Sequence, residues 1–228
     1  GVVVFSNPPL SPISASAGIP QALADALGAL DGTPEVRAIV LAAEGRMFSA
    51  GADIAEFDQD ATVIAGPTRR LLDVLDGLTK PVVCAIQGGA LGGGLELALA
   101  TDYRLATADA KLGLPEVTLG LIPGAGGTQR LPRVAGAARA AQMIAAGEVI
   151  GADEAGRLGI VDQIVDGDVR AAAIAFARKV AGQGRQRLRD NGVADAGRDE
   201  AIAAARAKAP AGAPGDAVAA LTGKPPAP

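Results

Sequence analysis

Two glutamates lie in surroundings where a carboxylate is unusual. Glu96 belongs to the otherwise apolar stretch LELALA, and Glu116 follows a proline in the glycine-rich stretch GLPEVTLGLIPGAGG. Burial of a carboxylate is costly unless the group is paired or used, and burial raises the pKa toward the range useful for proton transfer near neutral pH. Alone, each residue fits an ordinary solvated side chain. Together they predict a proton-transfer site in which two carboxylates flank one water or one acidic carbon.

The rest of the sequence offers few other groups for such chemistry. It contains no histidine and a single cysteine, Cys84. Ser-His-Asp and Cys-His nucleophile systems are therefore excluded, as are histidine metal sites, and we expect no bound metal. Cys84 lies in the apolar run KPVVCAIQG, which predicts a small core residue and not a nucleophile. A lone cysteine cannot form an internal disulfide, which is typical of the reducing cytoplasm.

A glycine-rich segment, GGALGGGLELALA, leads from an apolar run into a helix that we expect to begin near Gly94. The start of a helix presents unpaired backbone N–H groups and a partial positive charge, and these can hold a developing oxyanion. Glycines that only permit a tight turn are the alternative explanation. A dinucleotide-binding fingerprint is excluded because Leu97 and Gln129 stand where its third glycine would be.

These segments must be positioned by strands and helices that alternate along the chain. Apolar runs predict strands, and helical spacing of apolar residues predicts helices. The alternation predicts an α/β domain. The expected strands are Val2–Phe5, Val36–Ala42, Pro81–Ile86, Asp102–Ala106, Lys111–Leu114 and Val161–Val165. The expected helices are Ile19–Leu30, Pro67–Leu78, Gly94–Ala100, Ala137–Ala145, Ala152–Arg157 and Asp168–Val180.

The composition changes near Gly182, which predicts a catalytic core at residues 1–181 and an Ala- and Pro-rich tail or linker at residues 182–228. In this tail we expect helices at Ala194–Ala207 and Asp216–Leu221, or else a loosely packed extension. The formal net charge of −4 disfavours nucleic acid as a partner. Because no run of 18 apolar residues and no signal peptide is visible, we expect no membrane association and a cytoplasmic location.

Three segments closely resemble the crotonase superfamily, also called enoyl-CoA hydratase/isomerase. They are Met47–Phe57, Lys80–Thr107 and Lys111–Gly136, with weaker similarity from Val2 to about Val165. The resemblance implies a spiral of repeated ββα units, here with a C-terminal helical segment. It also implies that the substrate is an acyl-CoA thioester, with coenzyme A as part of the substrate and no separate cofactor.

The resemblance carries roles onto individual residues. The thioester carbonyl would lie between the backbone N–H groups of Ala52 and Gly93, which form the oxyanion hole. Water held between Glu96 and Glu116 would add to C3 of a trans-2-enoyl-CoA; in the usual family account Glu96 is the base-like partner and Glu116 the acid. The implied substrate-binding positions, among which Gly124 helps to hold the water, are Ala50, Asp53, Ile54, Gly89, Leu91, Pro115 and Gly124. The family often has a lysine after Ile54, where this chain has Ala55.

Several alternatives stay open at this point. One is a Δ3–Δ2-enoyl-CoA isomerase, or a protein with both activities, although members specialised for isomerisation commonly lack the first glutamate. Another crotonase reaction such as thioester hydrolysis, and a non-catalytic acyl-CoA-binding domain, are the others. The phrases FSNPP and LPEVTLGLIPGAGGTQ and the tail are most similar to the N-terminal part of multifunctional β-oxidation proteins. The family habit implies a trimer or hexamer, whereas a fragment of the multifunctional type would be a monomer.

Overall fold

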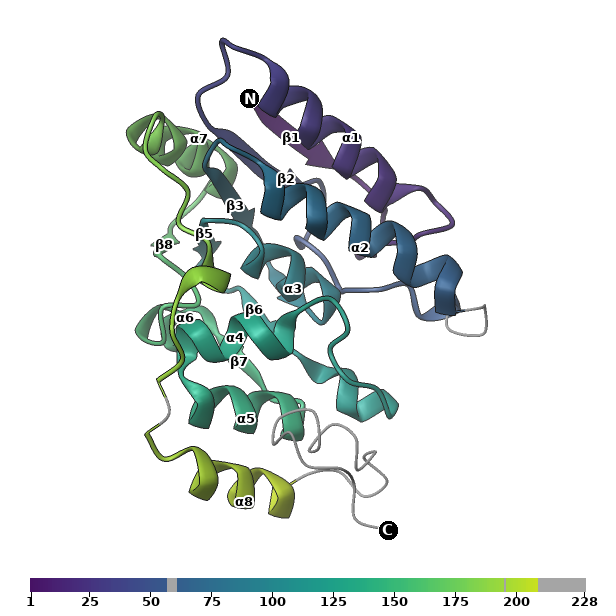
Figure 1. Cartoon of the computed structure of the whole chain (residues 1–228), viewed down its shortest axis with the longest axis vertical. Helices are drawn as coiled ribbons and strands as arrows, with labels where there is room; N and C mark the ends of the chain where they lie inside the picture. The colour runs from purple at the N-terminus through teal and green to yellow at the C-terminus, as the bar shows by residue number, and fades with distance from the viewer. Residues whose placement is uncertain (57–60, 195, 209–228) are drawn as a thin grey trace.

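The computed structural model describes residues 1–56, 61–194 and 196–208 of the chain, and in them two sheets are surrounded by helices (Figure 1). The larger sheet has five parallel strands in the order β1-β2-β3-β5-β8. Its strands are β1 (Val2–Phe5), β2 (Ile39–Ala43), β3 (Val82–Ile86), β5 (Tyr103–Thr107) and β8 (Gln163–Val165).

The smaller sheet lies next to it and joins β4 (Gly89–Leu91), β6 (Lys111–Gly113) and β7 (Val149–Gly151). Strand β4 is parallel to β6, and β6 is antiparallel to β7. The chain passes from β3 to β4 and then into α3 (Gly93–Leu99), and it repeats the step from β5 to β6. This is the ββα spiral, so the expected fold class is confirmed.

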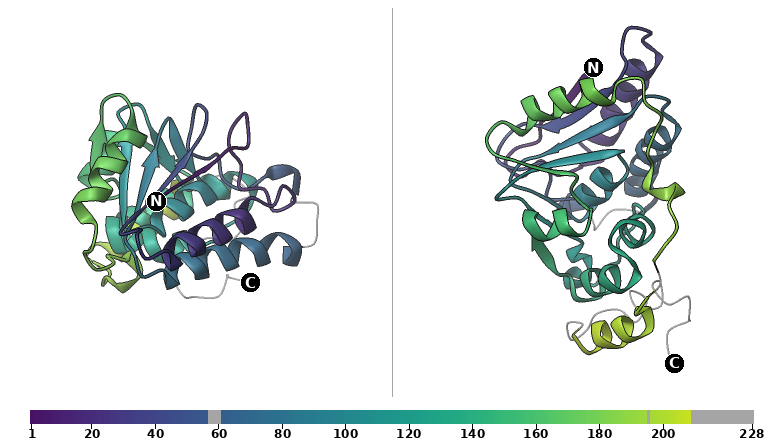
Figure 2. Two further views of the ribbon diagram at one scale, coloured as in Figure 1. Left: turned by 90° about the horizontal axis from the view of Figure 1, so that it is seen from above. Right: turned by 90° about the vertical axis from the view of Figure 1, so that its left-hand side faces the viewer.

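Both faces of the larger sheet are covered (Figure 2). Alternate residues of β3 enter different cores: Val82 and Cys84 pack toward α1 (Ile19–Gly32) and α2 (Ala61–Gly77), while Val83 packs toward α7 (Val169–Val180). A parallel sheet that is buried on both sides requires strands that are apolar throughout. Cys84 is fully buried, as its sequence context predicts.

The remaining elements complete the second half of the chain. They are α4 (Gly127–Ala135), α5 (Ala137–Ala146), α6 (Ala152–Arg157) and α8 (Arg198–Lys208), with short 3-10 turns η1 (Ile54–Glu56), η2 (Pro115–Leu119) and η3 (Leu188–Asp190). None of the helices that the structure describes is both long and apolar enough to cross a membrane.

Most predicted elements are present, with shifted ends. Helix α2 begins at Ala61, although Pro67 was expected to start it, and the tail helix begins at Arg198. Strands β4 and β7 and helix α4 were not predicted, because they are short, or glycine-rich, or contain a proline such as Pro132 in α4. The predicted helix Asp216–Leu221 lies outside the described residues.

After α7 the chain returns along the core. Arg185 pairs with the fully buried carboxylate of Asp102, with 2.6 Å between Nε and Oδ2. The same carboxylate accepts hydrogen bonds from the backbone N–H groups of Val82 and Gln186. Helix α8 then packs on α5 and buries Ala201. Residues 183–190 are therefore bound to the core by specific polar contacts.

Candidate active site

The loop at Ser49–Asp53 lies directly against the turn that leads from β4 into α3. Leu91 donates a backbone hydrogen bond to the carbonyl oxygen of Ser49 at 3.0 Å. Gly51 has a φ of 104°, and a Cβ there would lie 2.8 Å from the Leu91 oxygen and 3.2 Å from the Gly93 nitrogen. Only glycine fits at this position, because its φ is in the left-handed region and a side chain would collide with the backbone of Leu91 and Gly93.

This close approach brings together the two predicted oxyanion donors. A Cβ built on Gly93 would lie 3.4 Å from the backbone nitrogen of Ala52, so the two amides are neighbours. Gly93 is the first residue of α3, and its N–H therefore has no partner inside the helix. Neither N–H donates a hydrogen bond to another residue of the described ranges. Two such amides side by side can receive one oxygen that gains negative charge.

Glu96 lies one turn into α3 and is almost fully buried, with 3% of its surface exposed. Its Oε1 accepts hydrogen bonds from the backbone N–H groups of Ala125 at 2.8 Å and Gly127 at 2.7 Å. Burial raises the pKa of Glu96, while these two N–H groups and the positive charge of Arg130 act in the opposite direction. Glu96 is therefore held in one orientation by the turn that precedes α4.

Glu116 lies in η2 and differs from Glu96 in its hydrogen bonding. Both carboxylate oxygens are buried, and neither has a hydrogen-bond partner among the described residues. Burial and the negative charge of Glu96 raise the pKa of Glu116 to about 7, and the residue's own backbone N–H opposes this rise only weakly. A Cβ built on Gly92 would lie 3.2 Å from its Oε1, so the carboxylate faces the turn in front of α3. A buried, unsatisfied carboxylate needs a water or a ligand as partner.

The other predicted residues flank this centre. Ala50 and Asp53 belong to the same loop as Ala52, and Ile54 follows with 65% of its surface exposed. Leu91 ends β4 just before the glycine turn, and Pro115 opens η2 directly before Glu116.

Two further predicted positions are glycines. Gly124 is exposed and immediately precedes Ala125, which donates to Glu96. Gly89 is buried inside β4, where a Cβ would lie 2.8 Å from the carbonyl oxygen of Lys111, so close packing accounts for the glycine there.

The sequence alone did not single out Glu56, which has 2% of its surface exposed at the end of the oxyanion loop. Its carboxylate accepts hydrogen bonds from the Ser14 hydroxyl at 2.7 Å, the Ser16 N–H at 2.7 Å and the Ala15 N–H at 3.0 Å. Burial alone would raise the pKa of Glu56, but these hydrogen bonds outweigh it and lower the pKa to about 2. Glu56 thus fixes the loop that carries Ala52.

Arg130 was also missed. Its guanidinium is buried beneath the turn that binds Glu96, donates to the carbonyl oxygen of Ala125 at 3.1 Å, and pairs with Asp76 at 3.1 Å. The only signal in the sequence is an arginine four residues after Gly126, where one helical turn returns a side chain to the helix start.

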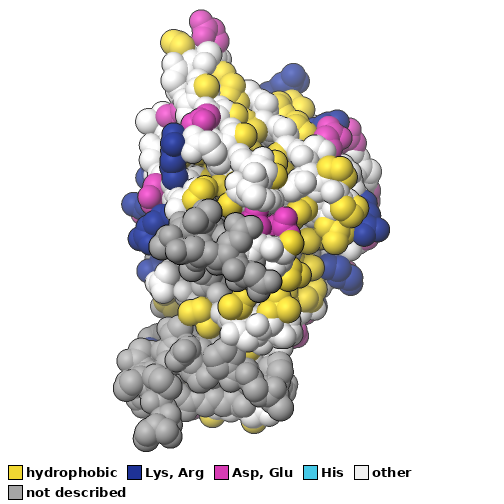
Figure 3. Space-filling model, turned by 90° about the vertical axis from the view of Figure 1, so that its right-hand side faces the viewer, with side chains coloured by type: hydrophobic (Ala, Val, Ile, Leu, Met, Phe, Trp, Pro, Cys, Tyr) yellow, Lys and Arg dark blue, Asp and Glu magenta, His cyan; other side chains and the backbone are white. Residues whose placement is uncertain are grey.

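The surface around the centre is largely apolar. Figure 3 shows one side of the molecule, where hydrophobic side chains surround a small group of acidic ones. Large hydrophobic residues that are exposed near the site elements are Ile54, Leu119, Leu121 and Ile122. Within the described ranges, no three His, Cys, Asp or Glu side chains are grouped so that they could hold a metal ion.

Comparison with known proteins gives consistent matches. The sequence model of a family described as "Enoyl-CoA hydratase/isomerase" matches residues 2–196. The chain is 43% identical to a "Probable enoyl-CoA hydratase" of Bacillus subtilis, over 78% of this chain and 72% of that protein. It is 48% identical to the "Peroxisomal bifunctional enzyme" of Homo sapiens, over 80% of this chain but only 25% of that protein. The chain thus spans about a quarter of the length of its bifunctional relatives.

Solved structures agree with the sequence matches. The crystal structure of an enoyl-CoA hydratase from Bacillus anthracis superimposes with a TM-score of 0.72 at 36% identity, covering 91% of this chain and 77% of that one. A protein from Pseudomonas aeruginosa, DspI, gives a TM-score of 0.73, also at 36% identity, over 82% of this chain and 74% of that one.

Proposed function

Because this chain belongs to the enoyl-CoA hydratase/isomerase family, we propose that it adds water across the C2–C3 double bond of trans-2-enoyl-CoA thioesters, a step of fatty acid β-oxidation. The observation that carries the proposal is the pair of carboxylates with different hydrogen bonding, Glu96 and Glu116, beside the adjacent backbone amides of Ala52 and Gly93. Such a site combines a proton donor, a proton acceptor and an oxyanion hole.

The two hydrogen-bonding states suggest which carboxylate does what. Burial raises the pKa of Glu96, but its carboxylate accepts hydrogen bonds from two N–H groups and lies near Arg130, and both of these favour its charged form. Glu116 accepts no hydrogen bond from another described residue, and its pKa of about 7 leaves a large protonated fraction at neutral pH. We therefore assign Glu96 as the base toward water and Glu116 as the acid toward carbon.

The reaction then proceeds in balanced steps. The amides of Ala52 and Gly93 polarise the thioester carbonyl, so that C3 becomes electrophilic. The water oxygen bonds to C3 while Glu96 takes one water proton, and the π electrons move toward C2 and the carbonyl oxygen. Glu116 gives its proton to C2 and is left ionised. A proton passes from Glu96 to Glu116 through solvent before the next cycle.

The proposal extends to binding. Ala50, Asp53, Ile54 and Leu91 would contact the coenzyme A part, and Pro115 and Gly124 the reacting end and the water. The apolar side chains Leu119, Leu121 and Ile122 are exposed beside η2 and suit an aliphatic acyl chain. No additional cofactor is needed, because Glu96 takes the proton from water and Glu116 supplies the proton to C2.

The test is the loss of absorbance at the conjugated thioester band of crotonyl-CoA. Wild type, Glu96→Gln and Glu116→Gln are compared with Glu35→Gln, a matched change at an exposed glutamate outside the site. We expect turnover by wild type and by Glu35→Gln, and almost none by the other two variants. Wild-type rates in both site variants would contradict the mechanism.

Isomerisation of 3-enoyl-CoA is the second candidate activity, because the unsatisfied Glu116 next to the oxyanion amides could shuttle a proton between two carbons. The same set of variants separates the two activities. If 3-enoyl-CoA is converted and Glu96→Gln retains that conversion, isomerase activity resides in Glu116. Binding of acyl-CoA without any turnover would favour a non-catalytic domain.

Organisation and location stay proposals of the same kind. We propose a core at residues 1–181 followed by a tail of the type that links the halves of bifunctional enzymes, and hence a monomer. A trimer or hexamer in light scattering would contradict this. A cytoplasmic location is supported by the single, reduced Cys84 and by the Bacillus relative.

A further inference from the structure

The turn that binds Glu96 is itself built around an arginine. The Arg130 guanidinium donates from Nη1 to the carbonyl oxygen of Ala125 at 3.1 Å. The backbone N–H of Ala125 in turn donates to Glu96. Arg130 is 8% exposed, and its own backbone N–H bonds to the carbonyl of Gly126. Gly126 has a φ of 97°, which lets the chain fold over the guanidinium. Displacement of Arg130 would therefore move the donors to Glu96.

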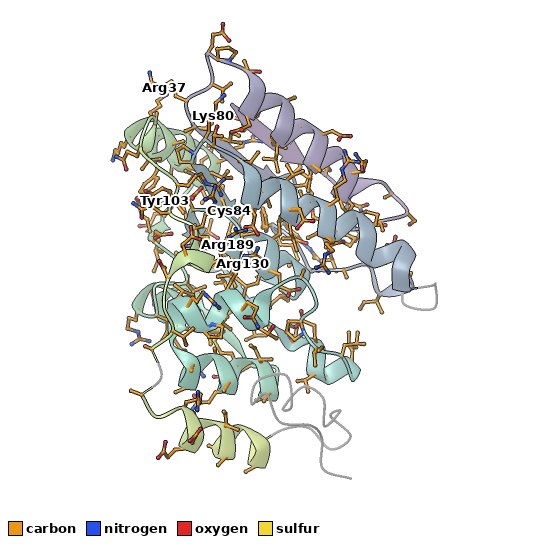
Figure 4. All side chains as sticks on the ribbon, in the orientation of Figure 1. Arg37, Lys80, Cys84, Tyr103, Arg130 and Arg189 are labelled. Atoms are coloured by element: carbon orange, nitrogen blue, oxygen red, sulfur yellow. The ribbon has the colours of Figure 1, made fainter. Side chains whose placement is uncertain are left out.

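A second layer holds Arg130 in place. Its Nη2 lies 3.1 Å from Oδ2 of Asp76 in α2, and the same oxygen lies 2.9 Å from Nη1 of Arg189 in η3. Figure 4 shows Arg130 and Arg189 next to each other where η3 crosses the helices of the core. The residues in contact come from α2, α4 and the returning C-terminal segment, so three distant parts of the chain meet behind Glu96.

The charges around Glu96 explain why such a network matters. From η2 it faces Glu116, which is negative when ionised, and from α4 it faces Arg130. Behind Arg130 lie one negative group, Asp76, and one positive group, Arg189, which pair with each other. Burial raises the pKa of Glu96, and Arg130 is the cation that, together with the N–H groups of Gly127 and Ala125, opposes this rise. Without it, two carboxylates would share a largely desolvated site.

We propose that Arg130 is a positioning residue of this reaction, which holds the Ala125–Gly127 turn on Glu96 and places a positive charge beside it, and that Asp76 and Arg189 lock it there. The inference rests on the proposed function only for its kinetic readout. It assigns the C-terminal segment, through Arg189, a part in shaping the proton-transfer site.

The primary test compares Arg130→Met with Arg130→Lys. In Arg130→Met we expect kcat to fall on the order of 10- to 100-fold with little change in KM, because the turn shifts while substrate contacts remain. The acid limb of the pH profile of kcat/KM should move up by about one pH unit, since Glu96 loses its cation. Arg130→Lys should restore the position of this limb more than it restores kcat. Arg189→Gln should show the same pattern with a loss of about two- to fivefold.

Arg70→Met is the matched control, because Arg70 also pairs with an aspartate, Asp25, but at an exposed site on α2. It should keep the wild-type pH profile. A purely structural role would lower the thermal midpoint of Arg130→Met without moving the acid limb, and that result would overturn the inference. If Arg130→Met does not fold, the pH profile of Arg189→Gln and the kcat of Arg130→Lys decide: an unmoved acid limb in the first together with a wild-type kcat in the second would overturn the inference.

A readout without turnover separates this inference from the proposed function. Glutamate carboxyl carbons labelled with ¹³C are titrated by NMR, and Glu96 is identified by the signal lost in Glu96→Gln. A rise in the pKa of Glu96 in Arg130→Met or Arg189→Gln, with little change in Arg130→Lys, supports the network even if wild type fails to hydrate crotonyl-CoA. An unchanged titration in an active enzyme rejects the network and leaves the hydratase proposal intact.

Discussion

Glu56 ends η1, which follows the loop that carries Ala52, and Glu116 lies in η2 and faces the turn before α3; both have buried carboxylate oxygens. The Glu56 carboxylate accepts hydrogen bonds from a serine hydroxyl and two backbone N–H groups, and its pKa is lowered to about 2 although burial alone would raise it. The Glu116 carboxylate accepts no hydrogen bond from another described residue, and its pKa rises to about 7. The contrast teaches that the supply of donors, and not burial, separates a glutamate that fixes a loop from one that is free to exchange a proton.

The largest effect that the comparison predicts is catalytic. Glu116→Gln or Glu96→Gln should each lower kcat by about 10³-fold, within the range for general acid–base groups. Because the two are proposed to act as a unit, the double variant should lose about the same factor and not its square. Rate assays on the three variants check this, and losses that multiply would show that the carboxylates act independently.

For Glu56 the comparison predicts an effect on folding stability and not on catalysis. Glu56→Gln should lower the free energy of unfolding by about 2–3 kcal/mol, because a neutral amide replaces a charged acceptor of buried donors. Its kcat should fall far less than that of Glu116→Gln. Urea unfolding at pH 7 measures the first quantity and the crotonyl-CoA assay the second. If Glu56→Gln kept its stability but lost turnover, Glu56 would not be a residue that only fixes the loop, and the contrast with Glu116 would be wrong.

The sign of the pH dependence sharpens the contrast. The folded pKa of Glu116 lies above its unfolded value, so its ionisation costs stability as pH rises from about 4.5 to 7, and Glu116→Gln should be more stable than wild type by about 1–3 kcal/mol at pH 8. Near pH 4 the two proteins should converge. Glu56, with a lowered pKa, contributes stability above about pH 4.5 that is lost as pH falls toward 2.

The smallest effect comes from removing a single donor to Glu56. Ser14→Ala deletes the hydroxyl that lies 2.7 Å from the carboxylate. Stability should fall by about 1 kcal/mol, and the pKa of Glu56 should rise from its low value. Urea unfolding and a ¹³C titration of the labelled carboxyl measure the two effects. A Glu56 that titrates unchanged would mean that the two backbone N–H groups alone set its pKa.

The sequence predicted those parts of the molecule that depend on neighbours along the chain. Strand β1 and helix α5 were found because their apolar periodicity is uninterrupted, and Glu96 and Glu116 because charge is conspicuous in an apolar stretch. Glu56 and Arg130 were missed because their partners are distant: Ser14 lies 42 positions from Glu56, and Asp76 lies 54 from Arg130. The catalytic roles and the domain boundary remain predictions.

The pairing of Arg185 with Asp102 has a consequence for how the protein is made. The two residues are 83 positions apart, so at about 5–20 residues per second a ribosome adds the arginine roughly 4–17 seconds after the aspartate. Until then Asp102, which directly precedes β5 and is completely buried in the finished core, has no arginine partner. The nascent sheet therefore cannot close around Asp102 without a large penalty. We therefore expect the core around Asp102 to close only after the segment that follows α7 has emerged.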